Sequence, residues 1–211
     1  TSALNTAAIY TFLPCIAALY AAILVKERIG RKRIVALVLG TFGALWVVFR
    51  GDFDLAFGLG FNKGDLIFLA GLFAMGLYTP LVRRFNRDEP AAVMSFWVLA
   101  AGTLWLLLLS NVTVFETDWM AVELDVFAGA AYLAVFTTII TFFIMQHATL
   151  QVGPTRVMSY GYLIPAFVVV LEWALGKGLP SAMTLPGIAI ILVAMFVVQS
   201  GGDLSRNPTA T

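Results

Sequence analysis

The chain has 211 residues, of which 61% are hydrophobic and 12% charged, and its mean hydropathy is +0.93. A soluble domain is typically about half apolar and about a quarter charged, so the composition excludes an ordinary soluble domain and indicates an integral membrane protein. The net charge of +1 argues against a nucleic-acid surface. The single cysteine, Cys15, excludes an internal disulfide, and we expect it to be a packed, inert thiol.

Uncharged runs with charged flanks predict seven membrane-spanning helices, and therefore an all-α polytopic membrane protein. In chain order the runs cover residues 3–25, 34–49, 66–82, 90–110, 126–148, 155–176 and 183–200. The second and third runs are short, about 16 and 17 residues, against roughly 20 for a typical spanning helix. We therefore expect the arginines that flank them to extend toward the interface.

Two of these spans contain a proline near their middle, Pro14 in the first and Pro165 in the sixth. Proline has no N–H, so the carbonyl four residues earlier, that of Tyr10 or Gly161, loses its usual partner. An unpaired backbone group in lipid costs several kcal/mol, so each break should face protein, water or a bound molecule. Broken helices at matching places in two halves of a chain are typical of the solute sites of secondary transporters.

The distribution of basic residues predicts the orientation. Ten of them fall on one side of the predicted topology: Lys26, Arg28, Arg31, Lys32, Arg33, Arg83, Arg84, Arg87, Arg156 and Arg206. The other side has three: Arg50, Lys63 and Lys177. The richer side should be cytoplasmic, which places the carboxy terminus inside and the first residue outside. We therefore expect the sequence to be the later part of a longer protein.

The first two spans have an echo in the last two. A shift of 151 residues lays the first span on the sixth and the second on the seventh, with Pro14 on Pro165 and Gly43 on Ala194. The paired spans run in opposite directions, which is the inverted-repeat pattern of transporters. The second span also carries small residues at every fourth position, which lets helix backbones approach closely in lipid: Ala36, Gly40 and Ala44.

These elements resemble a known family. An uncharged helix with a central Pro14, the triplet Lys26-Glu27-Arg28, and then a helix with small residues at Ala36 and Gly43 resemble the end of an EamA-type repeat of the drug/metabolite transporter superfamily. Residues 134–165 are similar to the corresponding stretch of the family's second repeat.

The resemblance implies ten helices in two five-helix repeats with both termini cytoplasmic. This chain would supply helices four to ten as a partial inverted repeat. Residues 1–50 would be the last two helices of the first repeat, residues 64–202 the complete second repeat, and residues 203–211 a cytoplasmic tail. One departure is that Gly178 occupies the position that matches Glu27 in the second copy.

Polar residues near mid-depth, together with the two prolines, are candidates to line a solute cavity. They are Tyr10, Thr11, Pro14, Tyr78, Thr138, Thr141, Ser159, Tyr162 and Pro165. For any single polar residue among them, a hydrogen bond between helices is the alternative role.

Two ionisable residues are candidates for coupling transport to an ion gradient. Glu172 is a carboxylate within the sixth span, where ionisable groups are costly and usually functional. Its alternative role is to reach the outer headgroups beside Trp173. His147, the sole histidine, could relay protons, or it could simply end a helix with polar contacts to headgroups. One histidine and one cysteine cannot build a conventional zinc cluster, so no metal or cofactor is expected.

The function that these features favour is a secondary transporter that moves a small organic solute by alternating access, with proton coupling as one option. The alternative is a seven-helix receptor or a non-transport membrane scaffold. A retinal protein needs a lysine in its last helix, and residues 183–200 contain none. Nucleophile-elbow and phosphate-loop motifs are also missing from the sequence, which disfavours an enzyme and an ATP-driven pump. The expected partners are the solute and the lipid bilayer of a bacterial inner membrane, with a homodimer as an open alternative.

Overall fold

The computed structural model describes residues 1–52, 54, 58, 60, 62–110, 116–176 and 182–200. Among these residues, every assigned element is a helix, and each of the seven predicted spans is helical. The predicted tail at 203–211, the basic residues Lys177 and Arg206, and Gly178 lie outside the described residues.

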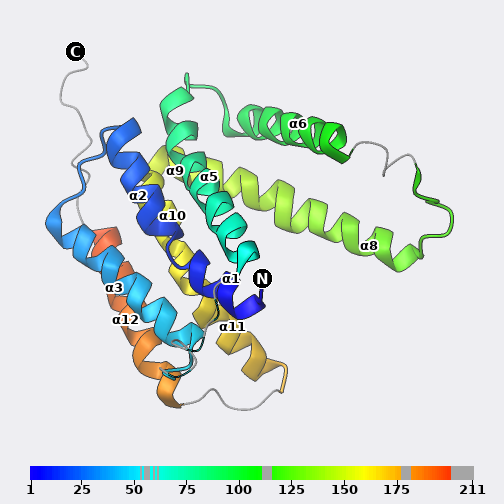
Figure 1. The fold of residues 1–211 in the computed structure, drawn as a ribbon. Helices are drawn as coiled ribbons and strands as arrows, with labels where there is room; N and C mark the ends of the chain where they lie inside the picture. Colours follow the sequence, from blue (N-terminus) through cyan, green and yellow to red (C-terminus); the bar gives the residue numbers. More distant parts are fainter. Residues whose placement is uncertain are drawn as a thin grey trace. The chain divides into compact units, whose positions relative to one another are not determined.

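The chain forms two compact units, Thr1–Arg84 with Val152–Thr211, and Phe85–Gln151. Figure 1 labels the helices of both. The described elements of the first unit are α1 (Ala3–Tyr10), α2 (Leu13–Leu24), α3 (Arg31–Val48), α5 (Lys63–Phe85), α10 (Pro154–Ser159), the 3-10 turn η2 (Tyr160–Tyr162), α11 (Leu163–Ala174), the 3-10 turn η3 (Ala182–Thr184) and α12 (Leu185–Ser200). Those of the second unit are α6 (Ala91–Ser110), α8 (Leu124–Tyr132), the π-helical η1 (Leu133–Ile140) and α9 (Thr141–Val152).

Six helices of the described residues are long and apolar enough to cross a membrane, among them α5, α6 and the broken helices of the first and sixth spans. Helix α3 is not among the six because its first turn consists of Arg31, Lys32 and Arg33. Arg33, the arginine that flanks the second span, is 8% exposed and is therefore packed against protein. The third span is also not short, because α5 continues through its charged flanks to a length of 23 residues.

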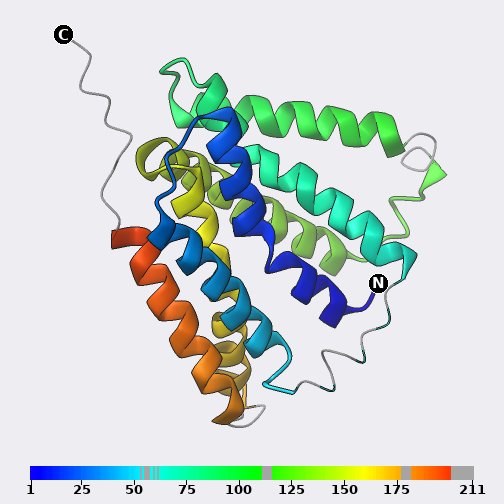
Figure 2. The ribbon, with the colours of Figure 1, turned by 60° about the vertical axis from the view of Figure 1, so that its left-hand side comes forward.

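Helices α3 and α12 form the most extensive contact of the first unit, and Figures 1 and 2 both show them side by side. A methyl group on Gly43 would lie 3.0 Å from the carbonyl oxygen of Gly187, so the two backbones nearly touch. The indole nitrogen of Trp46, near the end of α3, donates a hydrogen bond of 2.7 Å to the carbonyl of Met183, just before α12. The end of one helix thus meets the start of the other, and the two run antiparallel, as the inverted pattern predicts.

Helix α5 is attached to the broken first span at three levels. At its amino end the carboxylate of Asp65 accepts a hydrogen bond of 2.9 Å from the side-chain amide of Asn5 on α1. In its middle a methyl group on Gly76 would lie 2.7 Å from the Ile16 side chain of α2, so the two helices are in contact there. At its carboxy end Nη1 of Arg84 donates to the carbonyl of Leu24, at 2.9 Å.

A polar contact joins the first and last helices of the second unit. Ser95 of α6 donates a hydrogen bond to the side-chain carbonyl of Gln146 on α9, and both residues are buried. Lipid cannot solvate the polar side chain of Gln146, so a hydroxyl on the neighbouring helix supplies the hydrogen bond that water would otherwise make. It therefore fixes the pairing of α6 with α9.

Candidate functional site

The first predicted break is present at Pro14. Helix α1 ends at Tyr10 and α2 begins at Leu13, with the Thr11 hydroxyl donating to the carbonyl of Ala8 at 2.7 Å. Pro14 is the second residue of α2 and is fully buried. At this position its missing N–H is one that a helix start leaves unpaired in any case. The proline therefore divides the span into two helices at little further cost in hydrogen bonds.

The second predicted break is present ahead of Pro165. Helix α10 ends at Ser159, the 3-10 turn η2 follows, and α11 begins at Leu163. Pro165 is the third residue of α11 and is half-buried. Helices α2 and α11 each have 12 residues, so the segments after the two breaks have the same length.

The two breaks lie against each other. Helix α2 packs on α10, and a methyl group on Gly161 of η2 would lie 3.9 Å from Cγ of Pro14. Gly161 is the residue whose carbonyl the second proline was predicted to free. In the structure that carbonyl accepts a hydrogen bond from the backbone N–H of Leu163, and the residue itself lies against the proline of the other span.

Tyr162, a predicted cavity residue, makes hydrogen bonds between helices. Its hydroxyl donates to the carbonyl of Leu37 on α3 at 2.8 Å and lies 3.0 Å from the Thr41 hydroxyl. The Cys15 sulfur of α2 lies 3.5 Å from the same hydroxyl. The thiol was expected to be packed; it is half-buried and also makes this polar contact. The alternative role named for these residues, a hydrogen bond between helices, is the one that this geometry supports for Tyr162.

Ser159 is fully buried at the end of α10 and also joins two helices. Its hydroxyl donates to the carbonyl of Arg156 at 2.7 Å. The side-chain amide of Gln199 on α12 donates to that carbonyl at 3.2 Å and to the Ser159 hydroxyl at 3.4 Å. Gln199 was not singled out from the sequence. Its position near the end of the last span is the only signal that could have marked it.

Three further candidates of the first unit, Tyr10, Tyr78 and Glu172, are each half-buried. Glu172 is the tenth of the 12 residues of α11, two residues before its last residue, so it lies within the sixth span and near the end of that helix. The roles predicted for these three residues stay predictions.

The candidates of the second unit lie on or beside a π-helix, which the sequence analysis did not anticipate. Thr138 of η1 is half-buried, and the hydroxyl of the exposed Thr141 donates to the carbonyl of Phe136, five residues earlier, at 3.2 Å. His147 is exposed, stacks on Phe143 and contacts the amide of Gln151 at 2.8 Å. Local polar partners on its own helix favour the alternative role of His147 as part of a helix end.

A buried carboxylate that the sequence analysis passed over is Asp65, which is 0% exposed. It accepts hydrogen bonds from the Asn62 backbone N–H at 2.8 Å, from the amide of Asn5 and from the hydroxyl of Thr1. Its own N–H donates to the side chain of Asn62 at 3.0 Å, which completes a reciprocal cap at the start of α5. Asn62-Lys63-Gly64-Asp65 has residue types typical of a turn, but nothing in this stretch of sequence indicates that the Asp65 carboxylate is buried.

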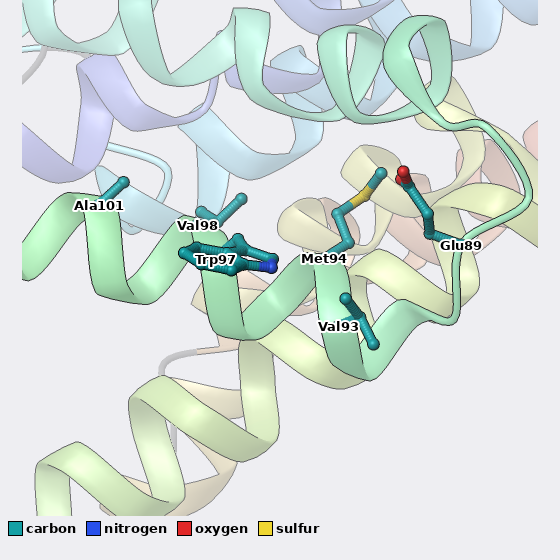
Figure 3. Close-up of a pocket in the computed structure, with 6 residues that line it drawn as sticks. All are labelled: Glu89, Val93, Met94, Trp97, Val98 and Ala101. Carbon is teal, nitrogen blue, oxygen red and sulfur yellow. The ribbon is translucent and has the colours of Figure 1, made fainter.

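A cavity of about 340 Å³ lies along α6 in the second unit, a volume within the range of small-molecule sites. It is lined by Glu89, Val93, Met94, Trp97, Val98 and Ala101. Figure 3 shows the Glu89 carboxylate and the Met94 thioether directed toward each other at one end, with the Trp97 ring further along the helix. The lining is apolar with one carboxylate, and no residue predicted as a site contributes to it.

The family described as "EamA-like transporter family" matches residues 62–200. The uncharacterized transporter YyaM of Bacillus subtilis (strain 168) is 23% identical over 91% of this chain, and an uncharacterized transporter of Archaeoglobus fulgidus is 20% identical over 84%. The chain covers 63% and 61% of these two relatives, less than two thirds of their length.

A solved crystal structure of another protein has the same fold, with a TM-score of 0.72 and 22% sequence identity. The match covers 93% of this chain and 67% of the chain in that structure.

Proposed function

We propose that this chain, which belongs to the EamA-like transporter family, acts as a secondary transporter that moves a small organic solute by alternating access. The observation that carries the proposal is the contact between the two breaks, in which Gly161 meets the buried Pro14. A broken helix leaves backbone groups that a bound solute can satisfy, and two such breaks that meet inside a helix bundle bring those groups to one place.

The proposed solute site comprises Tyr10 and Thr11 at the first break and Ser159 and Pro165 around the second. Tyr78 on α5 is a further proposed lining residue of this site. Thr138 and Thr141, which lie in the second unit, stay solute-binding candidates on the ground of the sequence alone. These side chains offer hydroxyls and apolar surface and no net charge, which suits a small amphipathic solute.

For the architecture, we propose that residues 1–50 end a first repeat and residues 64–202 form a second. The matched lengths of α2 and α11 and the antiparallel packing of α3 on α12 support this arrangement. We further propose a bacterial inner membrane with the carboxy terminus in the cytoplasm, on the ground of the basic residues alone. Glu172 is the proposed coupling group, because it is a carboxylate within the apolar sixth span, where an ionisable side chain is costly and usually functional.

The test is solute uptake by proteoliposomes that contain the protein encoded by the complete reading frame. A panel of radiolabelled amines, carboxylates and zwitterions would be assayed with wild type, Pro165→Ala and the control Pro80→Ala. Pro80 is a suitable control because it is fully buried inside α5 without dividing that helix. We expect Pro165→Ala to lower the uptake rate at least tenfold at equal membrane abundance, with Pro80→Ala within about threefold of wild type.

Uptake of no solute by the wild type, or equal uptake by the Pro165 variant, would count against this mechanism. A receptor or a scaffold predicts the first of these outcomes, so the same experiment separates the classes.

A further inference from the structure

Tyr162 is the most deeply buried large polar side chain at the two breaks, with 1% of its surface exposed. It is the last residue of η2 and therefore belongs to the stretch in which the sixth span is broken. Its hydroxyl donates to the carbonyl of Leu37, in the interior of the unbroken helix α3. A direct bond thus joins the break to a continuous helix.

Two more side chains complete this contact. The Thr41 hydroxyl donates to the same Leu37 carbonyl at 3.1 Å and lies 3.0 Å from the Tyr162 hydroxyl. The Cys15 sulfur, one residue after Pro14, lies 3.3 Å from the Thr41 hydroxyl. One polar cluster therefore connects both breaks, through Cys15 on α2 and Tyr162 on η2, to a single turn of α3.

The ring of Tyr162 reaches this position because Gly40 has no side chain. A methyl group on Gly40 would lie 2.7 Å from Cε2 and 2.8 Å from Cδ2 of the ring. Gly40 is the middle member of the small-residue series on α3, so part of that series serves to receive an aromatic ring and not another helix backbone.

Helix α3, which accepts the hydrogen bond of Tyr162, is itself held in place because it packs on α12 through the close approach of Gly43 and Gly187. In an apolar surrounding, a buried hydroxyl that loses its partner cannot turn to water instead. The cluster therefore resists separation of η2 from α3 more than the same bonds would on a wet surface.

We propose that Tyr162, Thr41 and Cys15 form a lock that holds the two breaks against α3, so that both breaks and α3 move as one body during transport. Tyr162 is then a positioning residue for the break and not a ligand of the solute. The joint movement of the breaks and α3 rests on the proposed transport function, whereas the lock itself does not. The first test below needs no solute.

The first test uses the reaction of Cys15 with N-ethylmaleimide in proteoliposomes, followed at that residue by peptide mass spectrometry. Tyr162→Phe removes the hydroxyl and keeps the ring. Losing one hydrogen bond of about average strength should raise the labelling rate about fivefold. Thr41→Val should act in the same direction, and Thr41→Ser, which keeps a hydroxyl, should return the rate to within about twofold of wild type. Tyr160→Phe is the matched control, because Tyr160 lies in the same turn and is 52% exposed.

An unchanged labelling rate in folded Tyr162→Phe, or an equal increase in Tyr160→Phe, would overturn the lock. If Tyr162→Phe does not fold, the Thr41→Val and Thr41→Ser pair decides on the same criterion.

The second test measures transport of whichever panel solute the wild type carries. A positioning role predicts that Tyr162→Phe lowers the maximal rate severalfold and leaves KM within about twofold. A rise in KM of tenfold or more at an unchanged maximal rate would show that Tyr162 binds the solute, and would overturn the positioning role. If the wild type carries no solute, the transport proposal fails while the labelling result still decides the lock.

Discussion

The contact between α3 and α12 gives a sharp test of the packing, through Gly187→Ala. In a helix interior this change normally stabilises by roughly 0.5–1 kcal/mol, because glycine loses more backbone freedom on folding than alanine does. At Gly187 the new methyl group would lie 2.8 Å from Cδ1 of Trp46, 2.8 Å from Cγ2 of Val47 and 3.0 Å from the carbonyl oxygen of Gly43.

The structure decides which of the two effects is larger. Favourable contacts between carbon atoms are at about 3.5–4.0 Å, so all three neighbours would have to move by several tenths of an ångström. Forcing a methyl group into a packed interior costs about 1–3 kcal/mol. One of the neighbours is backbone, which cannot rotate away. We therefore expect a net loss of about 1–2 kcal/mol, and a fall in the unfolding temperature of roughly 4 °C for a chain of this size.

The assay is thermal unfolding of the purified protein in detergent, followed by tryptophan fluorescence. Gly71→Ala is the matched control, because a methyl group on Gly71 in α5 would meet nothing within 4 Å. Its unfolding temperature should equal that of wild type or exceed it by a degree or two. A Gly187→Ala variant at least as stable as Gly71→Ala would refute the reasoning that the two helices approach this closely.

Three further changes test other parts of the molecule. Asn5→Ala removes a donor to the buried Asp65 carboxylate, so thermal unfolding should show a loss of about 1.5–3 kcal/mol, and an unchanged stability would mean that the carboxylate is solvated. Ser95→Ala removes the donor to Gln146 and should cost about 1–2 kcal/mol in the same assay, with no loss expected if that bond is not formed in the membrane. Glu172→Gln should weaken the dependence of uptake on a proton gradient, and an unaltered pH profile of uptake would remove Glu172 from the mechanism.

The positions of the two breaks could be predicted from the sequence, but the presence of a proline alone was not sufficient to predict them. Pro14 and Pro165 both follow a break, whereas Pro80 lies inside a continuous α5. A proline removes one donor in each case, and whether the helix separates there depends on whether neighbouring elements can take up the freed groups. The match between the two halves marked the right prolines, because a single proline is compatible with either outcome.

Several features were out of reach of pattern reasoning. The π-helix in the fifth span is defined by its backbone hydrogen bonds, which join residues five apart. Its amino-acid composition is that of an ordinary membrane helix, so the sequence gives no signal for it. The burial of Asp65 requires Asn5, sixty residues earlier, to arrive beside it. The cavity along α6 is lined by ordinary membrane-helix residues and one loop carboxylate, which carry no spacing signal.

By itself the sequence determined that seven apolar stretches become helices, because lipid offers no partner to a backbone group and a helix satisfies its own. It also determined where two of them weaken. Only the tertiary structure decided that Gly161 meets Pro14 and that Gly40 receives the ring of Tyr162. Such contacts join residues that are far apart along the chain. They depend on how well two folded surfaces fit together, and the sequence of either segment does not reveal that fit.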